Sequence, residues 1–558
     1  MTAAETRREL RRLARLRGIQ LSYTGHDGRS VRASEDTLAG VLAALGHPVP
    51  NAATIHEQLR LAESEPPADG YEHADPTTDG TAPARRPAPI RGLGVVAPLY
   101  AIRGNDDWGI GSFRDLAAFA DLAASWRAQL IGTLPLFAMA TEVPIDPSPY
   151  LPVSRLFWNE LYVDVAGAAE LAGCEAPASM RPEPQVTQSH TTDYEAVSTA
   201  KRRALDACAT AMQAADGRRR EDFERFVSGH PGLTTYADFR AKGDEHASHY
   251  HRFVQYAAAT QLAESAAHGE RVGAGLYLDL PVGVHPEGFD TWANPDLFAD
   301  AQVGAPPDAL AEGGQAWGFP PLHPQRLRAS GYRYFIDALR VALRYARAIR
   351  VDHILGLQRL YWIPAGFDAS AGAYVRYPHD ELLAIVAIEA RRAGATVIGE
   401  DLGTVSPEIR RAMDRHGILH SFVQRFAASA EQPLPQPRLP SAASVGGHDL
   451  PRFAAYWRDP AQRDLVETLG IREPAAALRV CLGSLAAGPS AYVFADLADL
   501  EGETVADNRP GTGPEAGNWR RRLPRSIEQL AADEATTDLM HELAELRATA
   551  TMKEASSK

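Results

Sequence analysis

Three acidic side chains occupy similar places in the sequence. Asp352, Glu400 and Asp449 each follow a short apolar stretch that is expected to form a strand. Carboxyl groups in this arrangement can supply a nucleophile, a protonated acid and an anion that stabilises a cationic transition state. This is the chemistry of glycosyl transfer or of glycoside hydrolysis, provided that the three groups meet in space.

Helices and strands alternate around the first two carboxylates. Apolar residues recur at helical spacing over 335–346, before an expected strand at 348–351, and again over 382–390, before an expected strand at 396–398. This alternation predicts parallel strands joined by crossovers, so that successive strands end at the same rim. The C-terminal rim of a (β/α)8 barrel holds the active site in enzymes of that fold. We therefore predict an α/β protein with a (β/α)8 TIM barrel.

Each of these charged groups also has a purely structural interpretation. Arg350 and Asp352 project from the same side of one strand, so they are expected to pair, and a buried ion pair can serve only to satisfy two charges. Glu400 and Asp401 could instead cap the helix that follows them. We favour catalysis because three separate strand ends carry fitting residues.

The sequence around these residues is similar to that of the 4-α-glucanotransferases (amylomaltase, or disproportionating enzyme; glycoside hydrolase family 77). The resemblance is carried by 350–364, 399–405 and 448–451, and it extends over about 90–525. It implies a retaining enzyme that moves α-1,4-glucan segments from a donor maltodextrin to the 4-hydroxyl of an acceptor glucan or glucose. The expected partners are maltooligosaccharides, glucose and α-1,4-glucans.

The same resemblance implies roles for residues of this sequence. Asp352 would be the nucleophile, Glu400 the general acid and then the general base, and Asp449 the group that stabilises the transition state. The expected substrate-binding residues are Tyr150, Asp279, Trp317, Arg350, His448 and Asn508. Two of these keep a structural alternative, Tyr150 as a surface packing residue and Asp279 as a cap at a strand end.

The sequence departs from the family pattern at a few positions. Ala309 and Leu310 lie where some members carry aromatic residues, so a stacking contact on the acceptor side is expected to be absent. Ala498 lies where relatives often have Glu or Gln, which is expected to loosen one contact.

Changes in composition divide the 558 residues into segments. We predict a helical N-terminal module over 1–64, a Pro- and Gly-rich linker over 65–90, the barrel over 91–548 and a polar tail over 549–558. Within the barrel we expect a helical insertion at about 165–270. The family resemblance also implies a substrate-groove loop at about 300–322. No C-terminal β-sandwich is expected.

Composition argues against several classes of partner. The 57 basic and 71 acidic side chains give a net charge of −14, so we expect binding neither to nucleic acid nor to membranes. No stretch has the apolar length of a membrane span, and the N-terminus lacks the apolar core of a signal peptide. Cys174, Cys208 and Cys481 are odd in number and far apart, which favours a cytoplasmic location without disulfides.

No cofactor or metal is expected. Gly109 and Gly111 lack the G-x-G-x-x-G spacing of a dinucleotide site. His353, His448 and the nearby carboxylates lack the spacing of metal ligands. Two alternative functions stay open: an α-1,4-glucan hydrolase of the α-amylase clan, which would share the three carboxylates, and a non-catalytic glucan-binding barrel, against which the intact carboxylates argue.

Overall fold

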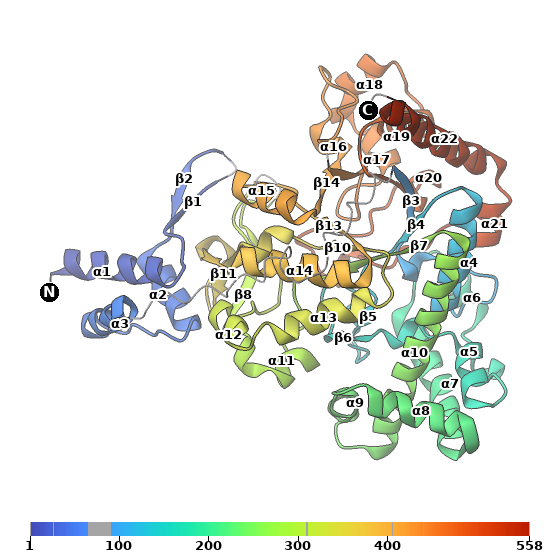
Figure 1. Ribbon diagram of the computed structural model, residues 1–558, viewed down its shortest axis with the longest axis horizontal. Helices are drawn as coiled ribbons and strands as arrows, with labels where there is room; N and C mark the ends of the chain where they lie inside the picture. Colours follow the sequence, from blue (N-terminus) through green and yellow to red (C-terminus); the bar gives the residue numbers. More distant parts are fainter. Residues whose placement is uncertain are drawn as a thin grey trace.

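A closed barrel of parallel strands forms the centre of the protein (Figure 1). The computed structural model describes residues 2–25, 27–64, 91–308, 311–403, 405–438 and 440–556. Within these residues, the barrel strands follow one another in chain order: β3 (Gly92–Val96), β4 (Leu130–Gly132), β7 (Gly275–Leu280), β10 (Ala348–Val351), β13 (Thr396–Gly399), β14 (Leu419–Val423), β15 (Ser441–Ser444) and β16 (Tyr492–Asp496). The predicted (β/α)8 TIM barrel is therefore confirmed.

The register of three neighbouring strands positions the first carboxylates. Arg350 on β10 pairs with Asp279 on β7, and Val351 on β10 pairs with Gly399 on β13. Asp352 and Glu400, one residue further along, therefore leave adjacent strands at the same level. Gly399 leaves room for the Ile354 side chain, because a Cβ atom at this position would lie 2.6 Å from Ile354 Cδ1.

Strand β14 was not predicted, because polar residues interrupt its apolar pattern. His420 and Ser421 lie in its middle, and both bond to the carboxylate of Asp401: His420 Nδ1 at 2.9 Å and the main-chain N–H of Ser421 at 3.0 Å. The suggested helix cap at Glu400 and Asp401 is wrong. The side chain of Ser406 caps the following helix, α15 (Pro407–His416).

Helices fill most of 165–270: α5 (Val165–Ala172), α6 (Pro184–Thr187), α7 (Tyr194–Ala214), α8 (Gly217–Gly229), α9 (Leu233–Ala241) and α10 (Glu245–Val272). The last of these helices, α10, is part of the barrel itself. Helix α10 packs against α4 (Phe113–Ser125) and leads directly into β7. It therefore belongs to the helical layer of the barrel and not to an insertion.

A second, antiparallel sheet flanks the barrel, with the order β12 (Ala373–Arg376), β11 (Arg359–Pro364), β8 (Ala301–Ala305) and β9 (Gln315–Ala316). The expected groove loop at about 300–322 thus includes two strands of this sheet. The departures expected at 309 and 310, and the linker at 65–90, lie outside the described residues.

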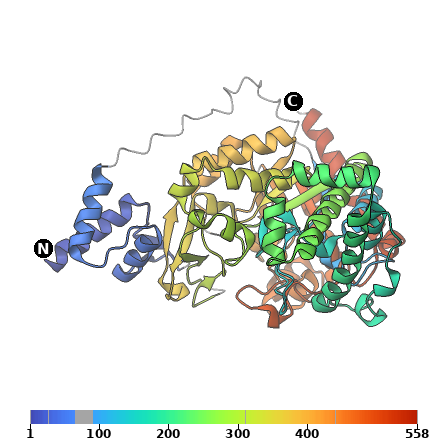
Figure 2. The ribbon, with the colours of Figure 1, turned by 90° about the horizontal axis from the view of Figure 1, so that it is seen from below.

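The N-terminal residues dock on this second sheet, at one end of the molecule (Figure 2). They form α1 (Ala3–Leu16), α2 (Glu35–Ala44) and α3 (Ala52–Ser64), with a hairpin of β1 (Ser22–Thr24) and β2 (Ser30–Arg32) that was not predicted. The chain after α1 extends the sheet, because Gln20 N–H donates to Tyr374 O at 2.8 Å and Arg376 N–H donates to Gly18 O at 3.0 Å.

Helix α22 (Glu534–Ser556) ends the described chain and packs against α19 (Pro474–Ala487), so part of the expected polar tail is helical. No strand follows β16 in the described residues. Among the same residues, no helix combines the length and the apolar character that crossing a membrane requires.

The contact between α2 and β11 can be tested at Gly40. A Cβ atom at this position would lie 2.8 Å from Pro364 Cβ. Gly40→Leu is therefore expected to lower the free energy of unfolding by about 1–3 kcal/mol, since overpacked side chains force their neighbours apart. Thermal or denaturant unfolding measures the change. Gly229→Leu adds the same volume where nothing lies within 4 Å, and it serves as control. Equal stability of the two variants would contradict this view of the contact.

Candidate active site

Two adjoining cavities, of about 620 and 810 Å³, open at the C-terminal rim of the barrel. Asp352, Glu400, His448 and Asp449 line both. We call these two cavities together the cleft. The other expected site residues all line it as well: Tyr150, Trp317 and Asn508 in the smaller cavity, and Asp279 and Arg350 in the larger. The structure thus brings every predicted site residue together.

Arg350 joins two carboxylates on neighbouring strands. Its Nη1 lies 2.7 Å from Asp279 Oδ2 and 2.8 Å from Asp352 Oδ1. The Tyr150 hydroxyl donates a further hydrogen bond to Asp279 Oδ2 at 2.7 Å. Burial raises the pKa of Asp279 to about 6, although Arg350 opposes the rise; the negative charge of Asp352 adds to it. Asp279 Oδ1 is buried and accepts no hydrogen bond from the described residues.

Main-chain groups hold both oxygens of Glu400. His353 N–H donates to Oε2 at 3.1 Å, and Leu402 N–H donates to Oε1 at 2.7 Å. The first bond depends on an unusual backbone, because His353 has φ +42°, in the left-handed region that side chains other than glycine rarely adopt. The turn that directly follows Asp352 therefore positions the neighbouring carboxyl group of Glu400.

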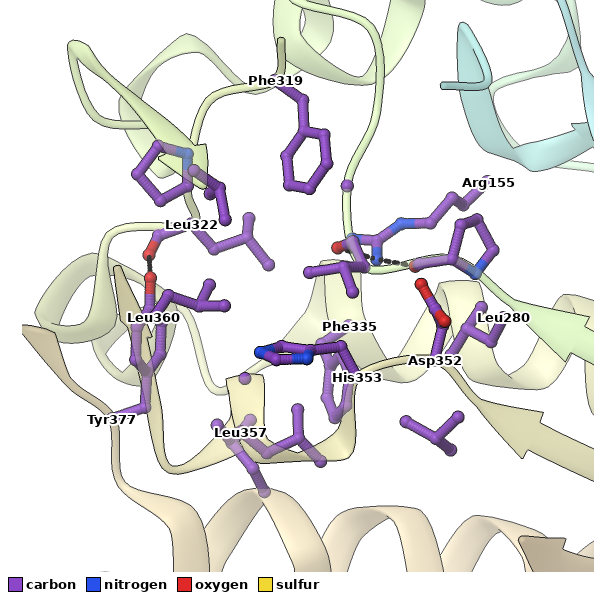
Figure 3. A pocket seen from close by; sticks show the side chains of 18 of the residues that line it. Arg155, Leu280, Phe319, Leu322, Phe335, Asp352, His353, Leu357, Leu360 and Tyr377 are labelled. Carbon is purple, nitrogen blue, oxygen red and sulfur yellow. Dashed lines mark hydrogen bonds between the residues drawn. The ribbon is translucent and has the colours of Figure 1, made fainter. Parts of the chain in front are cut away.

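His353 lines the smaller cavity of the cleft, and its side chain also lies in a small apolar pocket (Figure 3). Phe319, Phe335, Leu357 and Leu360 are among its lining residues, and Asp352 lies at its edge (Figure 3). The rings of Trp317 and His353 also meet in a T-shaped arrangement, with 5.2 Å between the ring centroids. This packing holds the imidazole in place, which stabilises the left-handed turn.

Asp449 is held from two sides. His448 Nε2 lies 3.3 Å from its Oδ2, and the Asn508 amide donates to its Oδ1 at 2.6 Å. Desolvation within the cleft favours the neutral acid. The interactions with His448 and Asn508 outweigh it and hold the pKa of Asp449 well below its usual value. Burial lowers the pKa of His448, but the contact with Asp449 outweighs burial and raises this pKa above its usual value. Tyr150 stacks on the His448 ring at 5.1 Å.

A buried ionic cluster lies beneath Asp449 and was not anticipated from the sequence. Arg452 pairs with Asp507, and its Nη1 lies 2.8 Å from Asp496 Oδ2. The Arg452 and Asp507 side chains are only 4% and 3% exposed. Burial raises the pKa of Asp507, against the effect of Arg452. Because Asp507 precedes Asn508, this cluster fixes the segment whose amide holds Asp449.

Two aromatic residues of the cleft were not predicted as site residues either. Phe426, 59% exposed, lines the larger cavity, and Trp519 lies 5.7 Å from the His448 ring. Phe426 follows β14, the strand whose pattern was missed, so its location could not be inferred. Ala498 is buried in α20 (Leu497–Leu500) and is not among the residues that line the cleft. In the described chain, no group of three or more potential ligands is arranged to hold a metal ion.

Titration of Asp279 should be visible in the stability of the protein. Its folded pKa of about 6 exceeds the ordinary value of 3.8, so the folded state binds more protons than the unfolded state between these pH values. The contribution of Asp279 to stability therefore falls as pH rises from about 4 to about 6. The difference in unfolding free energy, wild type minus Asp279→Asn, should fall by roughly 1–3 kcal/mol over this window. Denaturant unfolding at a series of pH values measures it, and a flat or rising difference would contradict the assignment.

Comparisons with known proteins agree with this geometry. Residues 97–249 and 242–528 match the family model described as 4-alpha-glucanotransferase, of glycoside hydrolase family 77. The 4-alpha-glucanotransferase of Mycobacterium tuberculosis is 34% identical over 541 residues, which cover 80% of this chain and 74% of the relative. That of Haemophilus influenzae is 32% identical over 418 residues, covering 65% and 60%.

Solved structures give the same result. Amylomaltase from Corynebacterium glutamicum superposes with a TM-score of 0.85 at 28% identity and covers 97% of this chain and 99% of its own. Amylomaltase from Streptococcus agalactiae, in complex with acarbose, has a TM-score of 0.71 at 20% identity, covers 82% and 99%, and supports the fold. The protein therefore belongs to the 4-alpha-glucanotransferases of glycoside hydrolase family 77, the enzymes that transfer α-1,4-glucan segments.

Proposed function

We propose that Asp352 and Glu400 carry out the two half-reactions of glucan transfer. An Asp352 oxygen bonds to the anomeric carbon of the donor while the bond to the departing 4-oxygen breaks, and Glu400 gives that oxygen its proton. The 4-hydroxyl of the acceptor then attacks the same carbon. Its proton returns to Glu400 and the bond to Asp352 breaks, so the α configuration is retained after two inversions.

One observation carries this assignment. Val351 pairs with Gly399 on the adjacent strand, and Asp352 directly follows the first while Glu400 directly follows the second. Both carboxyl groups therefore enter the same cleft at the same level. Arg350 pairs with Asp352 and not with Glu400, and this charge-assisted contact of 2.8 Å fixes the direction of the carboxylate that acts as nucleophile. Glu400 is held by main-chain N–H groups, which orient it towards the leaving oxygen.

The remaining residues are proposed to bind the sugar at the cleaved bond. Asp449 remains ionised and favours the oxocarbenium-like transition state, supported by its bonds to His448 and Asn508. The unpartnered Oδ1 of Asp279 suits a sugar hydroxyl, which would satisfy a buried acceptor.

Flat aromatic side chains complete the proposed sugar site. Tyr150 and Trp317 line the smaller cavity, and the exposed ring of Phe426 lines the larger. Such rings cover the C–H face of a glucose unit with little loss of side-chain entropy. We propose maltooligosaccharides as donors, and glucose or α-1,4-glucans as acceptors.

The cysteines of the described chain, Cys174, Cys208 and Cys481, are free thiols, which supports a reducing, cytoplasmic location.

The roles of the two carboxyl groups can be separated by substitution. With maltotriose alone, the wild-type protein should produce glucose and a ladder of longer maltodextrins. Asp352→Asn should abolish the ladder, and Glu400→Gln should slow its formation by roughly 10²–10⁴-fold, because the leaving oxygen lacks its proton donor. Chromatography of the products over time measures both.

A donor that needs no protonation provides the specific test of Glu400. Fluoride departs without help from an acid, so α-maltosyl fluoride should restore formation of the covalent intermediate in Glu400→Gln but not in Asp352→Asn. Fluoride release measures this step. Asp380→Asn, at a carboxylate 51% exposed on α14 (His379–Ala393), is the control and should transfer normally. Equal rescue of Glu400→Gln and Asp352→Asn, or rescue of neither, would contradict these assignments.

Arg452, in the buried cluster beneath Asp449, does not line the cleft but should affect catalysis through the residues it holds. Arg452→Met leaves Asp507 unpaired and is expected to lower kcat about tenfold or more with little change in KM, because the Asn508 segment loses its anchor. Arg452→Lys keeps the charge and should recover part of the loss. Arg522→Met breaks an equally buried pair, with Asp107, outside the cleft and controls for lost stability. Steady-state kinetics decides: a similar kcat loss in Arg522→Met would mean that general destabilisation explains both.

A further inference from the structure

A third polar cavity, of about 420 Å³, lies outside the barrel wall. Helix α15, strand β14 and the segment before β15 supply most of its lining residues, together with Asp401 after β13 and Ser441 at the start of β15. A crossover helix normally covers the space between two successive barrel strands. In the described residues between β14 and β15, the only helix is the single turn α16 (Gln424–Ala427). Prolines at 433, 435, 437 and 440 prevent a longer one, so this space stays open.

The cavity is cationic, on a chain whose net charge is −14. Arg410, Arg411 and Arg438 line it together with His420, Asp401 and Asp414. The two carboxylates already have partners, because His420 bonds to Asp401 at 2.9 Å and to Asp414 at 3.2 Å, and Arg410 Nε lies 3.6 Å from Asp401.

The positive charges of two of these arginines are not paired with a carboxylate. The side chains of Arg411 and Arg438 make no hydrogen bond or ion pair with any residue that the structure describes. The two carboxylates also raise the pKa of His420 despite its partial burial, which adds positive charge. The cavity therefore offers unpaired guanidinium groups to a ligand.

An unsatisfied buried hydroxyl also points to a ligand. Ser441 is 1% exposed and lines the cavity, and its Oγ has no hydrogen-bond partner among the described residues. A buried polar atom without a partner is costly, and a bound polar group would satisfy it. This observation is independent of the arginines.

The cavity adjoins the catalytic cleft. Asp401, Arg410, Ser421 and Phe422 line both this cavity and the larger cavity of the cleft. Asp401 also directly follows Glu400 in the sequence. The two cavities therefore share a wall, so a carbohydrate that extends from the cleft has this space next to it.

We propose that the third cavity binds a phosphate monoester carried by a carbohydrate. Planar guanidinium groups match phosphate oxygens, so Arg411 and Arg438 take the phosphate, while Asp414 and Ser441 take sugar hydroxyls. The volume falls within the roughly 300–1,000 Å³ that is usual for small-molecule sites. The ester has two sources, a free sugar phosphate or a phosphate on a glucan chain whose other end lies in the cleft. The second source rests on the proposed function of the cleft.

Glucose 6-phosphate, glucose and inorganic phosphate are the probes for a titration calorimetry test with the full chain. The wild-type protein should bind glucose 6-phosphate at least tenfold more tightly than either glucose or phosphate. Arg411→Gln combined with Arg438→Gln should remove this preference. Arg415→Gln is the matched control, since Arg415 lies on the same helix but pairs with Asp380 outside the cavity, and it should bind like the wild type.

A second measurement separates the two sources. Maltodextrin with a phosphate ester and the same chain without it are compared as donors. A wild-type preference of several-fold in kcat/KM for the phosphorylated chain, lost in the double variant, assigns the site to glucans. Tight binding of glucose 6-phosphate without that preference assigns it to a free sugar phosphate.

Several results would overturn the proposal. Glucose 6-phosphate that binds no better than glucose refutes it in the wild type alone, whether or not the variants fold. Equal weakening in Arg415→Gln would show that only diffuse charge is involved. Transfer from maltotriose, followed in the same samples, should be unchanged in the double variant, and this keeps failure of the third cavity distinct from failure of the cleft.

Discussion

The ion pairs of Arg350 with Asp279 and Asp352 are the constraint on which the rest of the site depends. Two carboxylates from adjacent strands face each other at the mouth of the barrel, and Asp279 is only 4% exposed. Without the guanidinium between them, their repulsion and their desolvation would both go uncompensated. The strand register places Arg350 on β10 directly beside Asp279 on β7. The same strand pairing that closes the barrel therefore also brings this ion pair together.

Each of the other carboxylates has partners of its own, and the kind of partner differs. Main-chain N–H groups hold Glu400, side chains of the cleft hold Asp449, and the buried Arg452 holds Asp507. Rigid partners of this kind keep charged groups in fixed directions before substrate arrives, which is the basis of electrostatic preorganisation. The aromatic side chains contrast with them, because Phe426 is largely exposed and free to meet a ligand.

The sequence allowed the barrel, the carboxylates at its rim and the pairing of Arg350 with Asp352 to be predicted. These features depend on local periodicity and on where apolar strands end. What could not be predicted depends on contacts between distant residues or on backbone conformation. The polar pattern of β14 makes sense only beside Asp401, Arg452 meets Asp507 across more than fifty residues of sequence, and no residue type indicates that His353 adopts positive φ. Likewise, helical periodicity alone could not show that α10 belongs to the barrel layer.

The docking of the N-terminal residues on β12 has a consequence for solubility. Residues 18 and 20 satisfy main-chain groups on the outer side of this strand. In a chain shortened past these residues, β12 would become a bare sheet edge that presents unpaired N–H and C=O groups. Such an edge is a template on which a strand of another molecule can add. The N-terminal module therefore protects the protein from edge-to-edge aggregation.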